Sequence, residues 1–172
     1  AGILHQVYYA HGSGVPLGAQ ADKDKFKLIT LDVGLNQAIL GLDLKDWYLE
    51  PDTAFVNKGA LCESFVGQEM LAYSDPFDKA DLYYWQRNQR GSHAEIDYLV
   101  TRSQAVVPVE VKSGHGARLQ SIRLFLKSHP SSPYGIRFSI HNYSVLDHIQ
   151  SFPLYAVAGS LEHNDRIIKY LD

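Results

Sequence analysis

Two short segments of the chain carry ionisable side chains spaced two residues apart. Glu95 and Asp97 lie in the first segment, and Glu110 and Lys112 lie in the second. Both segments alternate apolar and polar residues in the manner of β-strands. Side chains two apart in a strand point to the same face. Each pair therefore shares one face, while the intervening isoleucine, tyrosine and valine side chains point to the other face and can form a core.

The turn between these strands is centred between Ser103 and Gln104. A hairpin on that centre places Asp97 opposite Glu110 and Glu95 opposite Lys112. Opposed carboxylates repel unless a cation or a proton lies between them. Oxygen ligands of this kind suit Mg²⁺ or Mn²⁺, and Lys112 beside the metal would meet negative charge developing on a phosphate. The alternative is a solvated strand face with a cross-strand ion pair.

The surrounding elements predict how this pair of strands is held. We expect a hairpin near the N-terminus, two helices before the acidic strands, and a helix and further strands after them. Asn57 is the predicted N-cap of the second helix. The core order of helix, strand, strand, strand, helix, strand predicts an α/β fold, with helices packed on a mixed sheet. The expected strands are 3–9, 26–31, 82–86, 95–100, 106–112, 135–140 and 152–158, and the expected helices are 33–42, 58–73 and 119 to Pro130.

Composition excludes several classes of protein. The 172 residues are 45% hydrophobic and 20% charged, with a net charge of −3, which argues against a strongly basic nucleic-acid coat protein. Cys62 is the only cysteine, so the chain has no internal disulfide framework. No apolar run is long enough for a membrane-spanning helix, and a cytoplasmic location is expected. Because the chain begins at Ala1 rather than Met, we interpret it as a piece of a longer polypeptide.

Four segments together resemble a known family. They are Gly59–Leu71 (GALCESFVGQEML), Leu82–Arg87 (LYYWQR), Ala94–Tyr98 (AEIDY) and Pro108–Gly114 (PVEVKSG). This ordered set resembles the C-terminal domain of a large group of bacterial and archaeal AAA+ ATPases. The segments Ala1–Leu4 and Lys27–Leu35 resemble the stretch that leads into that domain.

The resemblance implies a restriction-endonuclease-like, or PD-(D/E)XK, fold and a divalent-metal site. Asp97 and Glu110 would bind Mg²⁺ or Mn²⁺, and Lys112 would position or activate the attacking water or stabilise the charged transition state. Glu63 would be the helix carboxylate, catalytic and metal-binding, of Holliday-junction-resolvase-like members. In this group an asparagine usually follows that glutamate, whereas this chain has Ser64.

The resemblance also implies the organisation of the whole polypeptide. Residues 1–50 would be a connecting segment, a hairpin plus a helix, that leads from an ATPase part upstream, and residues 51–172 would be the nuclease-like domain. No phosphate-binding loop of the GxxxxGK[ST] type occurs, so no ATP site is expected within these residues.

The leading functional hypothesis is therefore Mg²⁺-dependent hydrolysis of DNA phosphodiesters. The alternative is a non-catalytic platform that binds DNA or protein for the ATPase and retains a vestigial acidic site. Basic residues that would contact phosphates, or else form a solvated face, are Arg87, Arg90, Arg118, Arg123 and Lys127.

Overall fold

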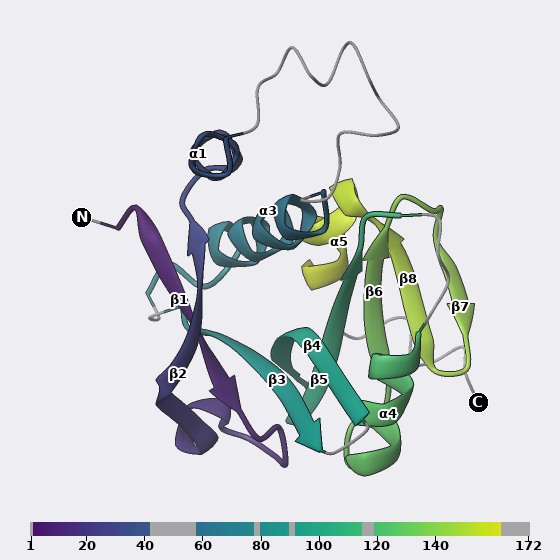
Figure 1. Cartoon of the computed structure of the whole chain (residues 1–172). Coiled ribbons are helices and arrows are strands. Elements are labelled where there is room, and N and C mark those ends of the chain that lie inside the picture. Colours follow the sequence, from purple (N-terminus) through teal and green to yellow (C-terminus); the bar gives the residue numbers. More distant parts are fainter. Residues whose placement is uncertain (1, 42–57, 78–79, 90–91, 115–118, 163–172) are drawn as a thin grey trace.

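A computed structural model describes residues 2–41, 58–77, 80–89, 92–114 and 119–162. Within these residues the strands form one eight-stranded sheet in the order β2-β1-β3-β4-β5-β6-β8-β7 (Figure 1). The pairs β1–β3, β5–β6 and β6–β8 are parallel, and the other neighbours are antiparallel. The strands are β1 (Leu4–Ala10), β2 (Ala21–Thr30), β3 (Leu82–Gln89), β4 (Ser92–Arg102), β5 (Ala105–Lys112), β6 (Gly135–Ser139), β7 (Ser144–Leu146) and β8 (Ile149–Pro153).

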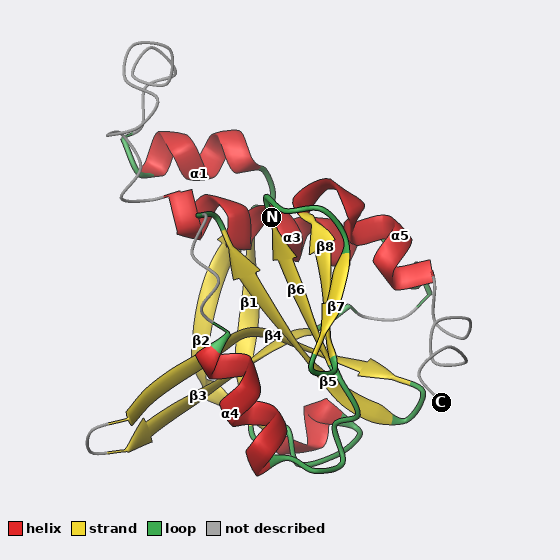
Figure 2. Cartoon of the chain, turned by 90° about the vertical axis from the view of Figure 1, so that its right-hand side faces the viewer, coloured by secondary structure: helices red, strands yellow, loops and turns green. Residues whose placement is uncertain are grey.

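Helices cover both faces of this sheet (Figure 2). On one face, α3 (Lys58–Ala72) and α5 (Val157–Glu162) pack on a core that includes Val66, Tyr98 and Val109. On the other face, α4 (Gln120–Ser128) buries Ile122 and Phe125 in a second core. The α1 helix (Val33–Ile39) begins after its N-cap Asp32 and packs against α3. Two short 3₁₀ helices cover Leu17–Gln20 and Leu154–Ala156.

The predicted mixed α/β fold and its core order of elements are confirmed. Two details are wrong: the strand expected over 152–158 is β8 followed by helical turns, and β7 was not predicted. The N-terminal hairpin is present, and β1 also pairs with β3. Both Asn57 and the boundary between residues 50 and 51 lie outside the described residues, so the domain division stays a prediction. No helix among the described residues is long and apolar enough to cross a membrane.

The hairpin of β4 and β5 has the predicted turn. Ser103 and Gln104 have positive φ angles of 45° and 67°, as a tight two-residue turn of type I′ requires. The paired residues run from Arg102–Ala105 to Tyr98–Val109, which is the register that the sequence predicts.

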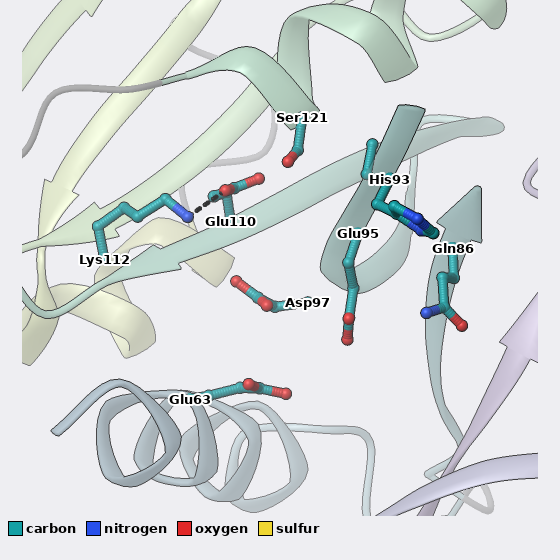
Figure 3. Close-up of a pocket in the computed structure, with 9 residues that line it drawn as sticks. Glu63, Gln86, His93, Glu95, Asp97, Glu110, Lys112 and Ser121 are labelled. Atoms are coloured by element: carbon teal, nitrogen blue, oxygen red, sulfur yellow. Dashed lines mark ion pairs between the residues drawn. The ribbon is translucent and has the colours of Figure 1, made fainter. Parts of the chain in front are cut away.

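A bulge in β4 changes the predicted alternation. Tyr83 of β3 pairs with Leu99, but Trp85, two residues on, pairs with Ile96. The extra residue in β4 shifts its side-chain alternation, so Ile96 packs in the α4 core while Tyr98 packs in the α3 core. The expectation that Ile96 and Tyr98 share a face is therefore wrong. Figure 3 shows Asp97 lying between Glu63 of α3 and the residues Glu110 and Lys112 of β5.

Candidate active site

The paired ladder of β4 and β5 ends where the acidic residues begin. Its last pair is Tyr98–Val109, one position before Asp97 and Glu110. The Asp97 carboxylate instead accepts a hydrogen bond from the backbone N–H of Val111 at 2.6 Å. A side chain thus replaces the backbone acceptor that a continued ladder would supply.

The predicted pairing of Glu95 with Lys112 is wrong. Beyond the bulge, Glu95 pairs across the sheet with Gln86 of β3, and Lys112 forms an ion pair with Glu110. A bulge bends the strand that carries it, and the pairing of β4 with β5 stops at this point. A cleft lies beside the unpaired ends of the two strands.

This cleft has a volume of about 330 Å³ and contains all four predicted catalytic residues. Figure 3 shows Glu63 entering from α3, Asp97 from β4, and Glu110 and Lys112 from β5. Ser121 of α4 lies at the opposite wall from Glu63. The cleft is lined by Glu63, Gln86, His93, Ala94, Glu95, Asp97, Glu110, Lys112 and Ser121.

Glu110 is a buried carboxylate with one unsatisfied oxygen. Only 2% of the residue is exposed. Its Oε1 atom contacts the Lys112 ammonium, while Oε2 is buried without a hydrogen-bond partner in the described part of the chain. Burial raises the pKa of Glu110, and the hydrogen bond from Lys112 only partly offsets that effect. An unpartnered buried oxygen is costly, which makes Oε2 a ready ligand for a cation.

Asp97 has the most strongly shifted carboxyl group of the cleft. Burial, followed by the neighbouring charge of Glu63 and then that of Glu110, raises the pKa of Asp97 to about 7. Lys27 and the N–H of Val111 act in the opposite direction. An acidic group held near neutral pH by burial and like charges is characteristic of catalytic and metal-binding sites.

Lys112 keeps its positive charge in this setting. Burial alone would lower the pKa of Lys112, but the hydrogen bond and the charge of Glu110, together with Asp97, raise it overall. About a third of the side chain is exposed, so the ammonium is accessible from the cleft.

Sequence reasoning missed Lys27, a residue of β2. Its ammonium forms ion pairs with Glu63 and, at 3.4 Å, with Glu95. In the sequence Lys27 follows Lys23 and Lys25 at spacings of two, a pattern that usually marks a solvated strand face. The available signal was its position at the start of the segment Lys27–Leu35, which resembles the family's leading stretch.

The cleft suits a divalent cation that keeps much of its water. Among the described residues, no three His, Cys, Asp or Glu side chains are grouped closely enough to hold a metal ion. A three-carboxylate cage of Glu63, Asp97 and Glu110 is therefore not preformed. Mg²⁺ commonly takes one or two carboxylates and retains several waters. The free Oε2 of Glu110 and the Asp97 carboxylate fit that requirement.

The three predicted phosphate contacts that fall in the described residues do not line the cleft. Arg123 of α4 forms an exposed ion pair with Asp147 at 2.8 Å, and Lys127 lies in the exposed last turn of the same helix. Arg87 is half-buried in β3. Of these three, none is among the described residues that line the cleft. Arg90 and Arg118 lie outside the described ranges.

Comparison with known proteins identifies a family for most of this sheet. Residues 58–157, from α3 to the start of α5, match a family described as Domain of unknown function (DUF4143). No curated protein and no solved structure shows a significant match to the chain. The matched region covers more than half of the chain and includes every residue of the cleft described above. The chain therefore belongs to the family described as Domain of unknown function (DUF4143).

Proposed function

We propose that the chain is a metal-dependent nuclease that hydrolyses DNA phosphodiesters, with a restriction-endonuclease-like fold. The observation that carries this proposal is the convergence of Asp97, Glu110 and Lys112 in one open cleft. An acidic pair with an unsatisfied oxygen beside an ammonium is the set of groups that phosphodiester hydrolysis uses. The resemblance to the C-terminal domain of AAA+ ATPases supports a role as part of such an ATPase.

Each residue has a distinct role in this proposal. Asp97 and Glu110 would hold Mg²⁺ or Mn²⁺, which when bound polarises the phosphate and lowers the pKa of a bound water. Lys112 would stabilise negative charge on the non-bridging phosphate oxygens, because its ammonium reaches the cleft beside Glu110. Glu63 would orient water from the α3 side, where it lines the same cleft.

Calorimetric titration with Mn²⁺ tests the metal site first. Wild-type chain should bind one metal ion, and both Asp97→Ala and Glu110→Ala should abolish binding. Asp147→Ala is the matched control, because this exposed carboxylate pairs with Arg123 and does not line the cleft. The metal site would be refuted by equal binding in wild type and in the two cleft variants.

A DNA-cleavage assay then tests the chemistry. With Mg²⁺ or Mn²⁺, Lys112→Met should lower the cleavage rate by at least about a hundredfold, which is the usual size of one electrostatic contact to a transition state. The same variant should still bind Mn²⁺. Cleavage at the wild-type rate by Lys112→Met would remove this residue from the mechanism.

One observation favours the non-catalytic alternative. Lysine side chains already neutralise Glu63 and Glu110, as expected of an acidic site that has become structural. On this alternative the chain is a DNA- or protein-binding platform of the ATPase. Absence of specific Mn²⁺ binding in the titration above would select it.

A further inference from the structure

Lys27 occupies an unusual position for a lysine. Only 22% of its side chain is exposed, and the ammonium lies over the rings of Tyr84 and Tyr98, at 5.1 and 5.2 Å from their centroids. Contacts of this kind with aromatic faces stabilise a cation. The ammonium group is thus held by the two tyrosine rings and by ion pairs with Glu63 and Glu95.

The carboxylates around the cleft outnumber the ammonium groups by two. Four carboxylates surround it, from Glu63, Glu95, Asp97 and Glu110. Two ammonium groups face them, from Lys27 and Lys112. With all four carboxyl groups ionised, the remaining double negative charge is equal in size and opposite in sign to the charge of one divalent cation. Lys27 therefore already supplies one of the positive charges that a metal would otherwise bring.

Lys27 and a metal ion would also compete for the same carboxylate, that of Glu63. The Oε1 atom of Glu63 is bound by the Lys27 ammonium, which keeps that oxygen directed towards β2. We propose that Lys27 is a tethered counter-cation that holds Glu63 away from the metal position and so lowers the affinity of the cleft for a divalent cation. The inference rests on the proposed metal site and adds a residue that regulates it.

Removal of the Lys27 charge provides the test. Mn²⁺ titration calorimetry on the 172-residue chain should show binding at least about tenfold tighter in Lys27→Met and in Lys27→Gln than in wild type, since a nearby like charge is removed. Lys27→Arg keeps the charge and should retain wild-type affinity. Lys25→Met is the matched control, because this exposed lysine of the same strand pairs with Asp22.

A double-mutant cycle with Glu63→Gln locates the effect. If Lys27 restrains Glu63, Glu63→Gln should weaken Mn²⁺ binding several-fold more in the Lys27→Met background than in wild type. Circular dichroism of each variant confirms that it is folded. If Lys27→Met alone is unstable, the double variant can be titrated in its place, because it loses one positive and one negative charge together.

The outcomes separate this inference from the metal site itself. Tighter binding in the two neutral variants supports the inference, including the case in which wild type binds no metal and the variants do. If wild type binds the metal and both neutral variants bind it with unchanged or weaker affinity, the inference is overturned and the metal site stands. Absence of binding in every protein overturns both.

Discussion

The carboxyl group of Asp97 makes the stability of the chain without a bound metal depend on pH. Its pKa is raised from 3.8 to about 7, first by burial and then by Glu63. The folded state therefore binds a proton that the unfolded state releases above about pH 4. The stabilisation from that proton is fully present below about pH 4 and is lost as the pH rises through about 7.

Replacement of Asp97 by Asn should reverse this loss. The amide cannot ionise, and its oxygen can still accept the Val111 N–H. Without metal, Asp97→Asn should be more stable than wild type by about 2 kcal/mol near pH 8, and should show no gain near pH 4. Urea denaturation in the presence of a chelator measures both values. Asp147→Asn, at an exposed carboxylate away from the cleft, should give no such gain near pH 8, and a pH-independent gain for Asp97→Asn would contradict the assigned shift.

Individual site residues were predicted to different extents. The spacing of two within strands, with the resemblance, identified Asp97, Glu110 and Lys112, and the resemblance alone supplied Glu63; all four line one cleft. Their metal-binding and catalytic roles stay predictions. Strand spacing could not place Lys27 in the cleft, because its ion pairs with Glu63 and Glu95 join residues that are 36 and 68 positions apart. Local spacing carries no information about such contacts.

At the scale of elements, the close approach of α3 to the sheet depends on Gly67. A Cβ atom at this position would lie 2.8 Å from Cδ1 of Ile29 and would also collide with the Tyr98 hydroxyl. That hydroxyl donates a hydrogen bond to the backbone carbonyl of Glu63 at 2.8 Å. Gly67 therefore sets the distance at which Glu63 enters the cleft.

Gly67→Ala should destabilise the protein by roughly 1–3 kcal/mol, the usual cost of overpacking, although alanine favours helix formation. Gly59→Ala is the matched control in the same helix, where the nearest neighbour of a Cβ atom would be Ser113 Oγ at 3.9 Å. It should be neutral or stabilising. Urea denaturation distinguishes the two, and equal effects of both substitutions would contradict the packing described here.

The turn between β4 and β5 should tolerate a stabilising substitution. Gln104 has a φ of 67°, a conformation that glycine adopts at little cost and other residues do not. Gln104→Gly should raise the free energy of unfolding by about 0.5–1 kcal/mol, because glycine is favoured at this position of a type I′ turn. Gln104→Ala loses the same side chain without gaining this freedom, so it should not stabilise. Thermal denaturation of the two variants provides the comparison.

Elements were predictable where their pattern is strong and local. The strands β4 and β5 and the helix α4 follow clear periodicities. Their order is confirmed, and so is the strand register from Arg102–Ala105 to Tyr98–Val109. The bulge at Asp97 was not predictable, because an inserted residue leaves no mark in a strand that still alternates on either side of it. The exposed three-residue strand β7 is too short to carry a pattern.

At the scale of the whole molecule, the charge distribution predicts that, on the proposed function, DNA binding depends on a metal. The net charge is −3, and carboxylates outnumber ammonium groups around the cleft. A phosphate that enters the cleft without a metal therefore meets like charge. A divalent cation would neutralise the cleft and so remove this repulsion.

We therefore expect the affinity for duplex DNA to rise at least about tenfold when Mn²⁺ replaces a chelator at constant ionic strength. Fluorescence anisotropy of a labelled duplex measures this change, and constant ionic strength is needed because salt itself weakens binding to DNA. Glu110→Ala should lose the gain, whereas Asp147→Ala should keep it. Equal affinity with and without metal would indicate a DNA-binding surface away from the cleft.

The overall arrangement of the sheet was only partly predictable. The mixed α/β class follows from the order of elements, whereas the parallel pairing of β1 with β3 joins strands that are distant in the sequence. A restriction-endonuclease-like fold remains part of the proposal. Nothing in the local pattern of residues 4–30 indicates which edge of the sheet the hairpin extends.

That pairing of β1 with β3 has a consequence for the order of folding. Contacts such as the hydrogen bond between His5 and the carbonyl of Ala80 span 75 residues, and the closure of so long a loop is slow. The hairpin that carries Lys27 should dock late, after α3, β4 and β5 have already brought Glu63, Asp97 and Glu110 together. During that interval the acidic residues lack one of their two lysine partners, so a divalent cation in the refolding buffer should accelerate formation of the core.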